Sequence, residues 1–269
     1  MDIKTLPRTG SKIKLRKVIS KQNYTVIAAA AFILVLALWQ LLSSSGVVSQ
    51  IFLPAPALVI EAFINGVKDG SLAADTWVSF SRIIKGFLLA TLIGVPLGIL
   101  VGSFSKIEAF ILPLTEFFRY LPVPAFVPLI MVWIGIGENA KVAVILLGIL
   151  FQLIPMVADN VKSVPSNLIN AAYTLGGKST TVIFKVILPA MLPKLMESLR
   201  MIMGWAWTYL VVAELVAANS GLGYNILKAQ RFLDTSSIFM GILVIGLLGL
   251  ITDRAFALLN KVLFRWVEE

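Results

Sequence analysis

The chain has 269 residues, of which 58% are hydrophobic and 14% are charged, and its mean hydropathy is +0.92. This composition leaves too little polar surface to cover a soluble globule, so lipid must cover the remainder. The sequence contains neither cysteine nor histidine, which excludes disulfides and thiol or imidazole catalysis and removes the commonest metal ligands.

The formal net charge of +9 is concentrated at the start of the chain. The basic residues there are Lys4, Arg8, Lys12, Lys14, Arg16, Lys17 and Lys21. A basic flank beside an apolar segment predicts contact with an anionic lipid leaflet and not with nucleic acid. The apolar run after Asn23 is longer than the apolar core of a signal peptide, and no small-residue cleavage site ends it. We therefore expect a basic cytoplasmic segment over 1–23 and a transmembrane domain over 24–269.

Long windows without charge predict membrane-spanning helices. The six expected spans are 24–43, 83–104, 107–135, 140–160, 192–217 and 236–260. Backbone polar groups in lipid must be satisfied within the segment, and the alternating pattern of barrel strands is absent. The predicted fold class is an all-α integral membrane protein with six transmembrane helices.

The distribution of lysine and arginine predicts an orientation in the membrane. The basic N-terminus is expected in the cytoplasm, and six spans return the C-terminus to the same side. The long loop between the fourth and fifth spans, with Lys162, Lys178 and Lys185, then also lies inside. Arg82 and Lys85 fall outside, where we expect them to cap the second span by reaching to the interface.

Two proline-rich segments interrupt the apolar pattern. An extended segment surrounds Pro54 and Pro56, after which 57–67 is expected to form a half-polar helix that lies along the outer surface or flanks the bundle. The third span contains Pro113, Pro122, Pro124 and Pro128. Because proline removes backbone donors, we expect a broken helix here that faces either protein or a water-filled path.

The loop from Lys162 to Pro193 is longer than a connection between packed helices requires, which indicates a function. Its small residues, its glycine break and its late proline predict two short helices joined by a sharp turn. The informative positions are Asn170, Ala171, Ala172, Leu175, Gly176, Gly177, Val186, Leu188 and Pro189.

At these positions the chain resembles the membrane subunits of ATP-binding-cassette importers. Their loop has the pattern E-A-A, three residues, G, nine residues, I, one residue, L-P. The spacing fits throughout, with Asn170 in place of the usual glutamate and Val186 in place of the usual isoleucine. The resemblance implies a type I importer permease fold in which this loop, about 162–190, is a coupling helix that docks on a cytoplasmic ATPase.

The same resemblance implies a location in the bacterial inner membrane and several partners. It implies ATPase subunits that bind ATP and magnesium, a second permease copy, and an external substrate-binding protein. The chain has no G-x-x-x-x-G-K-S/T phosphate loop, so we expect it to bind no cofactor itself.

Further resemblance, from about Leu53 onward, points to the permeases for nitrate, bicarbonate, taurine and alkanesulfonates. The matching stretches are Phe118 to Pro122, Val132 to Gly137, Val212 to Glu214 and Ser220 to Tyr224. The expected cargo is a small anion, with nitrate or bicarbonate favoured and taurine or an alkanesulfonate next.

Five residues are candidates for the substrate path: Arg119, Pro122, Pro124, Trp207 and Glu214. Arg119 lies inside an apolar span, where a cation is costly unless it meets an anion, water or a partner. It contacts either an anionic substrate or Glu116 one turn earlier, or it extends to the interface. Glu214 either closes an external gate or pairs with a basic group across the bundle.

Trp205, Trp207 and Tyr209 occupy alternate positions on a helix, so they cannot all face one partner. We expect one or two of them to line a path. The turn Ser220 to Gly223 is expected to be a flexible external segment that contacts a substrate-delivering protein.

Two other classes of function remain open. A membrane-embedded enzyme would have Glu116, Asp159, Glu197 and Glu214 as its acids, but no two of them form a catalytic signature. An ion-coupled secondary transporter would leave the loop motif unexplained, and no repeat relates the two halves of the sequence.

Overall fold

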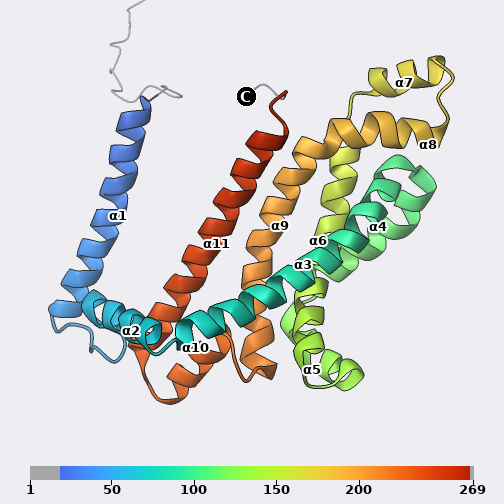
Figure 1. The fold of residues 1–269 in the computed structure, drawn as a ribbon. Helices are drawn as coiled ribbons and strands as arrows, with labels where there is room; N and C mark the ends of the chain where they lie inside the picture. Colours follow the sequence, from blue (N-terminus) through green and yellow to red (C-terminus); the bar gives the residue numbers. More distant parts are fainter. Residues whose placement is uncertain (1–18, 267–269) are drawn as a thin grey trace, which may run out of the picture. The chain divides into compact units, whose positions relative to one another are not determined.

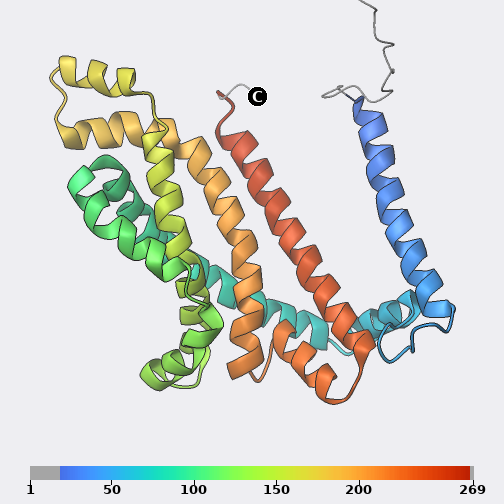
Figure 2. The same cartoon turned by 180° about the vertical axis from the view of Figure 1, so that it is seen from behind.

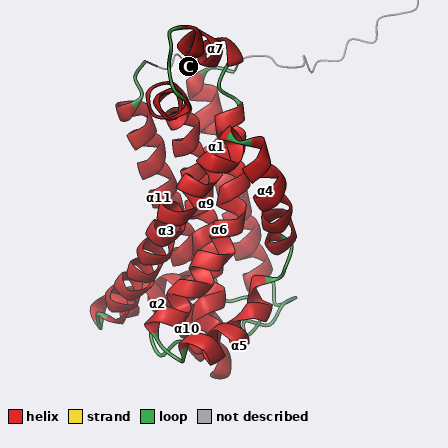
Figure 3. Ribbon diagram, turned by 90° about the vertical axis from the view of Figure 1, so that its right-hand side faces the viewer, coloured by secondary structure: helices red, strands yellow, loops and turns green. Residues whose placement is uncertain are grey.

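The computed structural model describes residues 19–266. Within that range the secondary structure is entirely helical, and Figure 3 shows helices joined by loops without a strand. The chain divides into two compact units, one ending at Pro56 and the other beginning at Ala57. Most of the expected basic segment 1–23 lies outside the described residues.

The first unit consists of α1 (Lys21–Ser44) and the segment that follows it. The Ser20 hydroxyl caps the helix by accepting a hydrogen bond from the Asn23 amide at 3.2 Å. After α1 the chain turns back, since the Trp39 indole donates to the Pro54 carbonyl at 2.9 Å and the Ser43 hydroxyl donates to the Leu53 carbonyl at 3.3 Å. The extended segment before Pro56 is thereby fixed to the end of its own helix.

The second unit contains the remaining helices (Figures 1 and 2). They are α2 (Pro56–Lys68), α3 (Ser71–Ser103), α4 (Ser105–Arg119), α5 (Val123–Ile134), α6 (Glu138–Lys162), α7 (Ser166–Thr174), α8 (Ser179–Val182), a π-helical turn (Ile183–Ile187), α9 (Leu188–Ala217), α10 (Leu222–Arg231) and α11 (Thr235–Leu263). Helices α7 and α8 lie at one end of this unit, here called the α7 end, and α5 and α10 lie at the opposite end, the α10 end.

Close packing of α3 against α6 forms the centre of the second unit. A row of glycines on α3 faces α6, and a Cβ added at Gly98 would lie 2.5 Å from the Val157 Cβ. A Cβ added at Gly86 would lie 2.7 Å from the Ile145 side chain, and one added at Gly94 would lie 2.9 Å from the Leu153 side chain. In lipid, small residues let helix backbones approach closely and gain van der Waals contact, so this row explains why these two helices pair.

Four described helices, α1, α3, α6 and α11, are long and apolar enough to cross a membrane. The expected third span is not one helix, because α4 and α5 meet at an angle of 101°, and the pair would make a fifth span. Helix α9 carries Lys194, Glu197 and Arg200 in its first half, so its membrane crossing stays a prediction. The break predicted from Pro122 and Pro124 is confirmed.

The expected start of the second span is wrong. Helix α3 begins at Ser71, well before residue 83, and it passes through Arg82 without interruption. A search for uncharged windows stops at a charged residue, whereas this arginine is buried and paired inside the unit. The prediction that Arg82 extends to the interface is therefore also wrong, while Lys85 is exposed and its place at the interface stays a prediction.

Candidate functional site

The loop at the α7 end forms two short helices around a glycine turn, as predicted. Gly176 adopts φ +80°, a backbone conformation that residues with a Cβ resist, and its amide donates to the Tyr173 carbonyl at 2.9 Å. The Gly177 amide donates to the Ala172 carbonyl at 2.9 Å, and a Cβ at Gly177 would lie 2.7 Å from that oxygen. These two glycines therefore permit the sharp return of the chain after α7.

Pro189 does not interrupt the helix that follows the glycine turn. The helix continues from α8 through the π-helical turn into α9, and Pro189 is near the start of α9. The Leu188 amide donates to the Ile183 carbonyl, one residue further back than in an α-helix. This wider turn lies just before Pro189, which has no amide hydrogen to donate and whose ring crowds an ordinary helical turn.

Helix α7 presents much of its surface to the outside. None of its residues is buried. Leu168 and Tyr173 on the helix and Leu175 directly after it are exposed hydrophobic side chains, with Leu175 88% exposed. Asn170 and Ala171 are exposed as well, whereas Ile169 and Ala172 pack against the core. The part of the predicted motif formed by Asn170 and Ala171 is therefore open to a partner.

A buried cluster of charged groups lies at the α10 end. The Glu214 side chain on α9 is 0% exposed and accepts hydrogen bonds from Arg82 Nη1 at 2.6 Å, the Ser79 hydroxyl at 2.8 Å and the Gly223 amide at 2.8 Å. The alternative that Glu214 pairs with a basic group across the bundle is thus confirmed. Because each acceptor position is occupied, burial of this carboxylate is compensated.

Arg82 continues this cluster to a second carboxylate on α6. Its Nε and Nη2 atoms donate to the two oxygens of Glu138, each at 2.6 Å, and Lys141 Nζ approaches the same carboxylate at 2.7 Å. Arg82 is 1% exposed and Lys141 is 5% exposed, whereas the Glu138 side chain is 56% exposed. Arg82 therefore joins three helices, α3, α6 and α9, at one point.

The turn between α9 and α10 is bound to this cluster. The Arg82 guanidinium donates to the Ser220 carbonyl at 2.7 Å, and the Gly221 amide donates to Asp75 at 2.6 Å. A Cβ on Gly221, whose φ is +111°, would collide with the Glu214 carboxylate and the Arg82 guanidinium. The expectation of a flexible Ser220 to Gly223 segment is wrong, because charged partners distant in sequence hold the turn.

The five path candidates fall into two groups. Arg119, Pro122 and Pro124 lie together at the exposed break between α4 and α5, and Trp207 and Glu214 lie on α9. The Arg119 guanidinium donates to the Tyr120 hydroxyl at 3.0 Å, with its central carbon 4.9 Å from that ring. Glu116 and Arg119 form no ion pair among the described contacts, so that alternative is wrong.

The three aromatic residues of α9 diverge as predicted. Trp207 is buried and its indole donates to the Thr252 hydroxyl on α11 at 3.0 Å. Tyr209 packs against Gly148 on α6, and Trp205 is exposed. Beside Trp207, an apolar groove with Gly204, Gly246 and Gly249 in its walls runs between α9 and α11.

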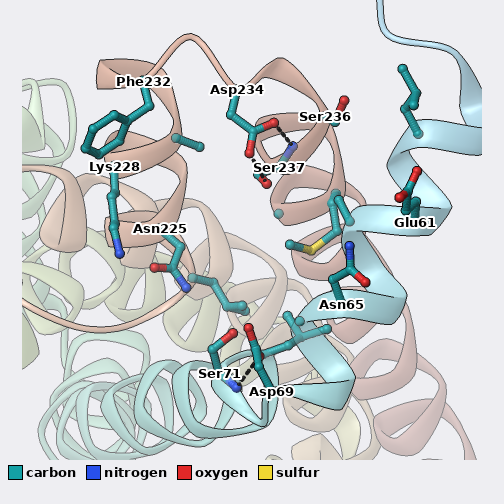
Figure 4. A pocket seen from close by; sticks show the side chains of 18 residues that line it. Glu61, Asn65, Asp69, Ser71, Asn225, Lys228, Phe232, Asp234, Ser236 and Ser237 are labelled. Carbon is teal, nitrogen blue, oxygen red and sulfur yellow. Dashed lines mark hydrogen bonds between the residues drawn. The ribbon is translucent and has the colours of Figure 1, made fainter.

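A cavity of about 610 Å³ opens between α2, α10 and α11 (Figure 4). Three carboxylates, Glu61, Asp69 and Asp234, and one ammonium group, Lys228, lie on its walls. Asp234 caps α11 by accepting from the Ser237 amide at 3.1 Å, and hydrogen bonds from Ser71 lower the pKa of Asp69 below its usual value. The lining is net acidic, which disfavours a small anion.

The fold of the second unit matches solved importer structures. An inward-facing structure of the MetNI methionine ABC transporter aligns with a TM-score of 0.60 at 20% identity, over 69% of this chain and 94% of that one. At this identity the likeness shows the fold alone. Together with the apolar helices and the broken span, it defines the class, a helical membrane protein with the fold of an ABC importer membrane subunit.

Sequence comparison identifies the family. Residues 94–265 match the family described as "Binding-protein-dependent transport system inner membrane component", and the chain belongs to it. Over 262 residues it is 33% identical to SsuC of Bacillus subtilis, a putative aliphatic sulfonates transport permease, covering 97% of this chain and 95% of that protein. It is 30% identical over 271 residues to the bicarbonate transport system permease CmpB of Synechococcus elongatus, covering 96% of each.

The chain is therefore a transport subunit of the branch that contains sulfonate and bicarbonate permeases, as its motifs predict. This assignment replaces the two alternatives, a secondary transporter and a membrane-embedded enzyme. Arg82 and Glu138 were missed as a site because nothing local in the sequence distinguishes them. Their partners lie 132 and 56 residues away along the chain.

Proposed function

We propose that the chain is the membrane-spanning half of an ATP-driven importer of a small oxyanion, with the α7 end in the cytoplasm. The exposed surface of α7 carries this proposal, because an importer permease must receive the motion of a separate ATPase. Residues Asn170, Ala171, Leu175 and Gly176 form the docking surface, and Ala172 and Val186 transmit its motion to the bundle.

The connection from α7 to the bundle suits the transmission of motion. Helix α8, the π-helical turn and α9 follow one another without a loop, in a helical stretch that bends in Figure 1 and begins beside the docking surface. Rotation of α7 by a closing ATPase would therefore turn α9 directly, and with it Trp207 and Glu214. Arg119, Pro122 and Pro124 would form the opposing part of the path, to be completed by a second permease copy.

The proposed cargo is bicarbonate or nitrate, with taurine or another alkanesulfonate as the second choice. SsuC and CmpB carry names for a sulfonate and for bicarbonate, and both are singly charged oxyanions near neutral pH. The external binding protein is expected to dock on the α10 end and to select among them. The N- and C-termini are then on the cytoplasmic side.

An ATPase assay tests the cargo. The permease and its partner ATPases are reconstituted in lipid with the external binding protein, which is loaded in turn with bicarbonate, nitrate, taurine or methanesulfonate. We expect one of these oxyanions to raise ATP turnover severalfold above the unloaded binding protein, because the loaded form shifts the complex toward the closed ATPase state. Stimulation only by a solute that has no oxyanion group would contradict an oxyanion cargo.

A further inference from the structure

The Glu138 carboxylate is held as a bound oxyanion would be. Its two oxygens receive parallel hydrogen bonds of 2.6 Å from Arg82 Nε and Nη2, and Lys141 Nζ lies 2.7 Å from one of them. A planar guanidinium that presents two donors in this way fits any group with two oxygens on one centre. Carboxylate, bicarbonate, nitrate and sulfonate all have this arrangement.

The cationic side of this contact is rigid. Arg82 is fixed from behind, since its Nη1 donates to Glu214 at 2.6 Å and to the Ser220 carbonyl at 2.7 Å. Lys141 is buried on α6 next to it. Arg82 therefore stays in place if the Glu138 carboxylate leaves, and Lys141 remains a buried cation beside it.

The anionic side is free to move. Glu138 is the first residue of α6, more than half of its side chain is exposed, and Gly135 and Gly137 just before it have open space around them. Glu214 cannot leave in the same way, because it is fully buried and held by Ser79 and Gly223 as well as by Arg82. The contact between Arg82 and Glu214 is therefore permanent, and the contact between Arg82 and Glu138 is exchangeable.

The charges select the occupant. The directly contacting groups are two cations, Arg82 and Lys141, and two carboxylates, Glu214 and Glu138. Departure of Glu138 leaves one uncompensated positive charge on buried groups, which is unfavourable unless a single negative charge replaces it. A singly charged oxyanion satisfies this requirement. The cavity between α2, α10 and α11 is a poorer site for such an anion, because its walls are net acidic.

We propose that Arg82 and Lys141 form an oxyanion receptor at the α10 end and that Glu138 occupies it until a substrate anion takes its place. The inference rests on the proposed function in that the ligand is the oxyanion cargo. Exchange of Glu138 for the cargo would release the start of α6 from Arg82 and so link anion arrival to movement of the α5–α6 turn.

Chemical rescue tests the receptor. The full chain with Glu138→Ala is purified in lipid nanodiscs, and its melting temperature is measured against formate, bicarbonate and methanesulfonate at constant ionic strength. We expect the variant to melt below wild type and to recover saturably with each two-oxygen anion, while chloride has no such effect. Glu138→Gln should respond in the same direction, and it replaces the alanine variant if that one does not fold.

Two further variants separate the receptor from a general salt effect. Adding Lys141→Met to Glu138→Ala should weaken the apparent affinity for each anion severalfold. Glu108→Ala removes the partner of Lys162 at the α7 end, a pair at 2.6 Å without an arginine fork, and should gain no stability from the anions.

The receptor is contradicted if the oxyanions stabilise Glu138→Ala no more than chloride does, or if Glu108→Ala responds equally. The melting measurement needs neither ATPase nor transport. A negative result therefore removes the receptor and leaves the proposed importer function standing, while failure of ATPase recruitment leaves a positive rescue result intact.

Discussion

Replacing Gly176 with proline is expected to abolish stimulation of the partner ATPases while leaving the bundle folded. Gly176 has φ +80°, whereas proline is fixed near −65°, and proline also removes the amide that donates to Tyr173. The turn after α7 must then change shape. Because no residue of α7 is buried, we expect the core to keep most of its packing contacts. The measurement is ATP turnover of the reconstituted complex, together with the melting temperature of the permease.

Gly70 offers a matched control at the opposite end. It too has a left-handed conformation, with φ +76° and open space around it, at the turn between α2 and α3. Gly70→Pro should cost a similar strain energy, about 1–3 kcal/mol, yet leave ATPase stimulation near wild type. Equal loss of stimulation in both variants would mean that general destabilisation, and not the loop, is responsible.

Replacing Arg82 with glutamine is expected to cause the largest loss of stability of any single change at the α10 end. The substitution leaves the buried Glu214 carboxylate without its cation and frees Glu138 from the guanidinium. Breaking a buried ion pair by removing one partner costs about 3–5 kcal/mol. We expect a strongly lowered melting temperature in lipid and reduced recovery of folded protein.

The comparison for this prediction is the exposed pair between Lys162 and Glu108. Lys162→Gln should cost no more than about 1 kcal/mol, because solvent screens such pairs. Combining Arg82→Gln with Glu214→Gln should recover part of the lost stability, since the buried charge is then gone. If Arg82→Gln had the same melting temperature as wild type, the cluster would not hold α3, α6 and α9 together.

Signals that act over a few residues predicted most of the α7 end. The glycine pair at Gly176 specifies the turn, and Pro122 and Pro124 specify the break between α4 and α5. The bend of 101° and the π-helical turn could not be predicted. Both depend on how neighbouring helices accommodate proline, which is a property of packing and not of composition.

The charged cluster around Arg82 could not be predicted from local sequence. The sequence predicts an interfacial Arg82, because an unpaired arginine at membrane depth is costly. Its burial becomes acceptable only because two carboxylates approach it from α6 and α9, far away along the chain. A basic partner for Glu214 across the bundle can be predicted from the sequence, but nothing local identifies it as Arg82.

The central claim is that α7 recruits the ATPases, and retention of these subunits by Leu175→Asp tests it most directly. Leu175 is almost fully exposed beside the glycine turn, so the charge should not disturb the fold. Leu233→Asp, at an exposed position between α10 and α11, is the control. We predict that wild type and Leu233→Asp co-purify with the ATPases and that Leu175→Asp loses most of them. Full retention by Leu175→Asp, or no association with wild type in any lipid, would contradict the account.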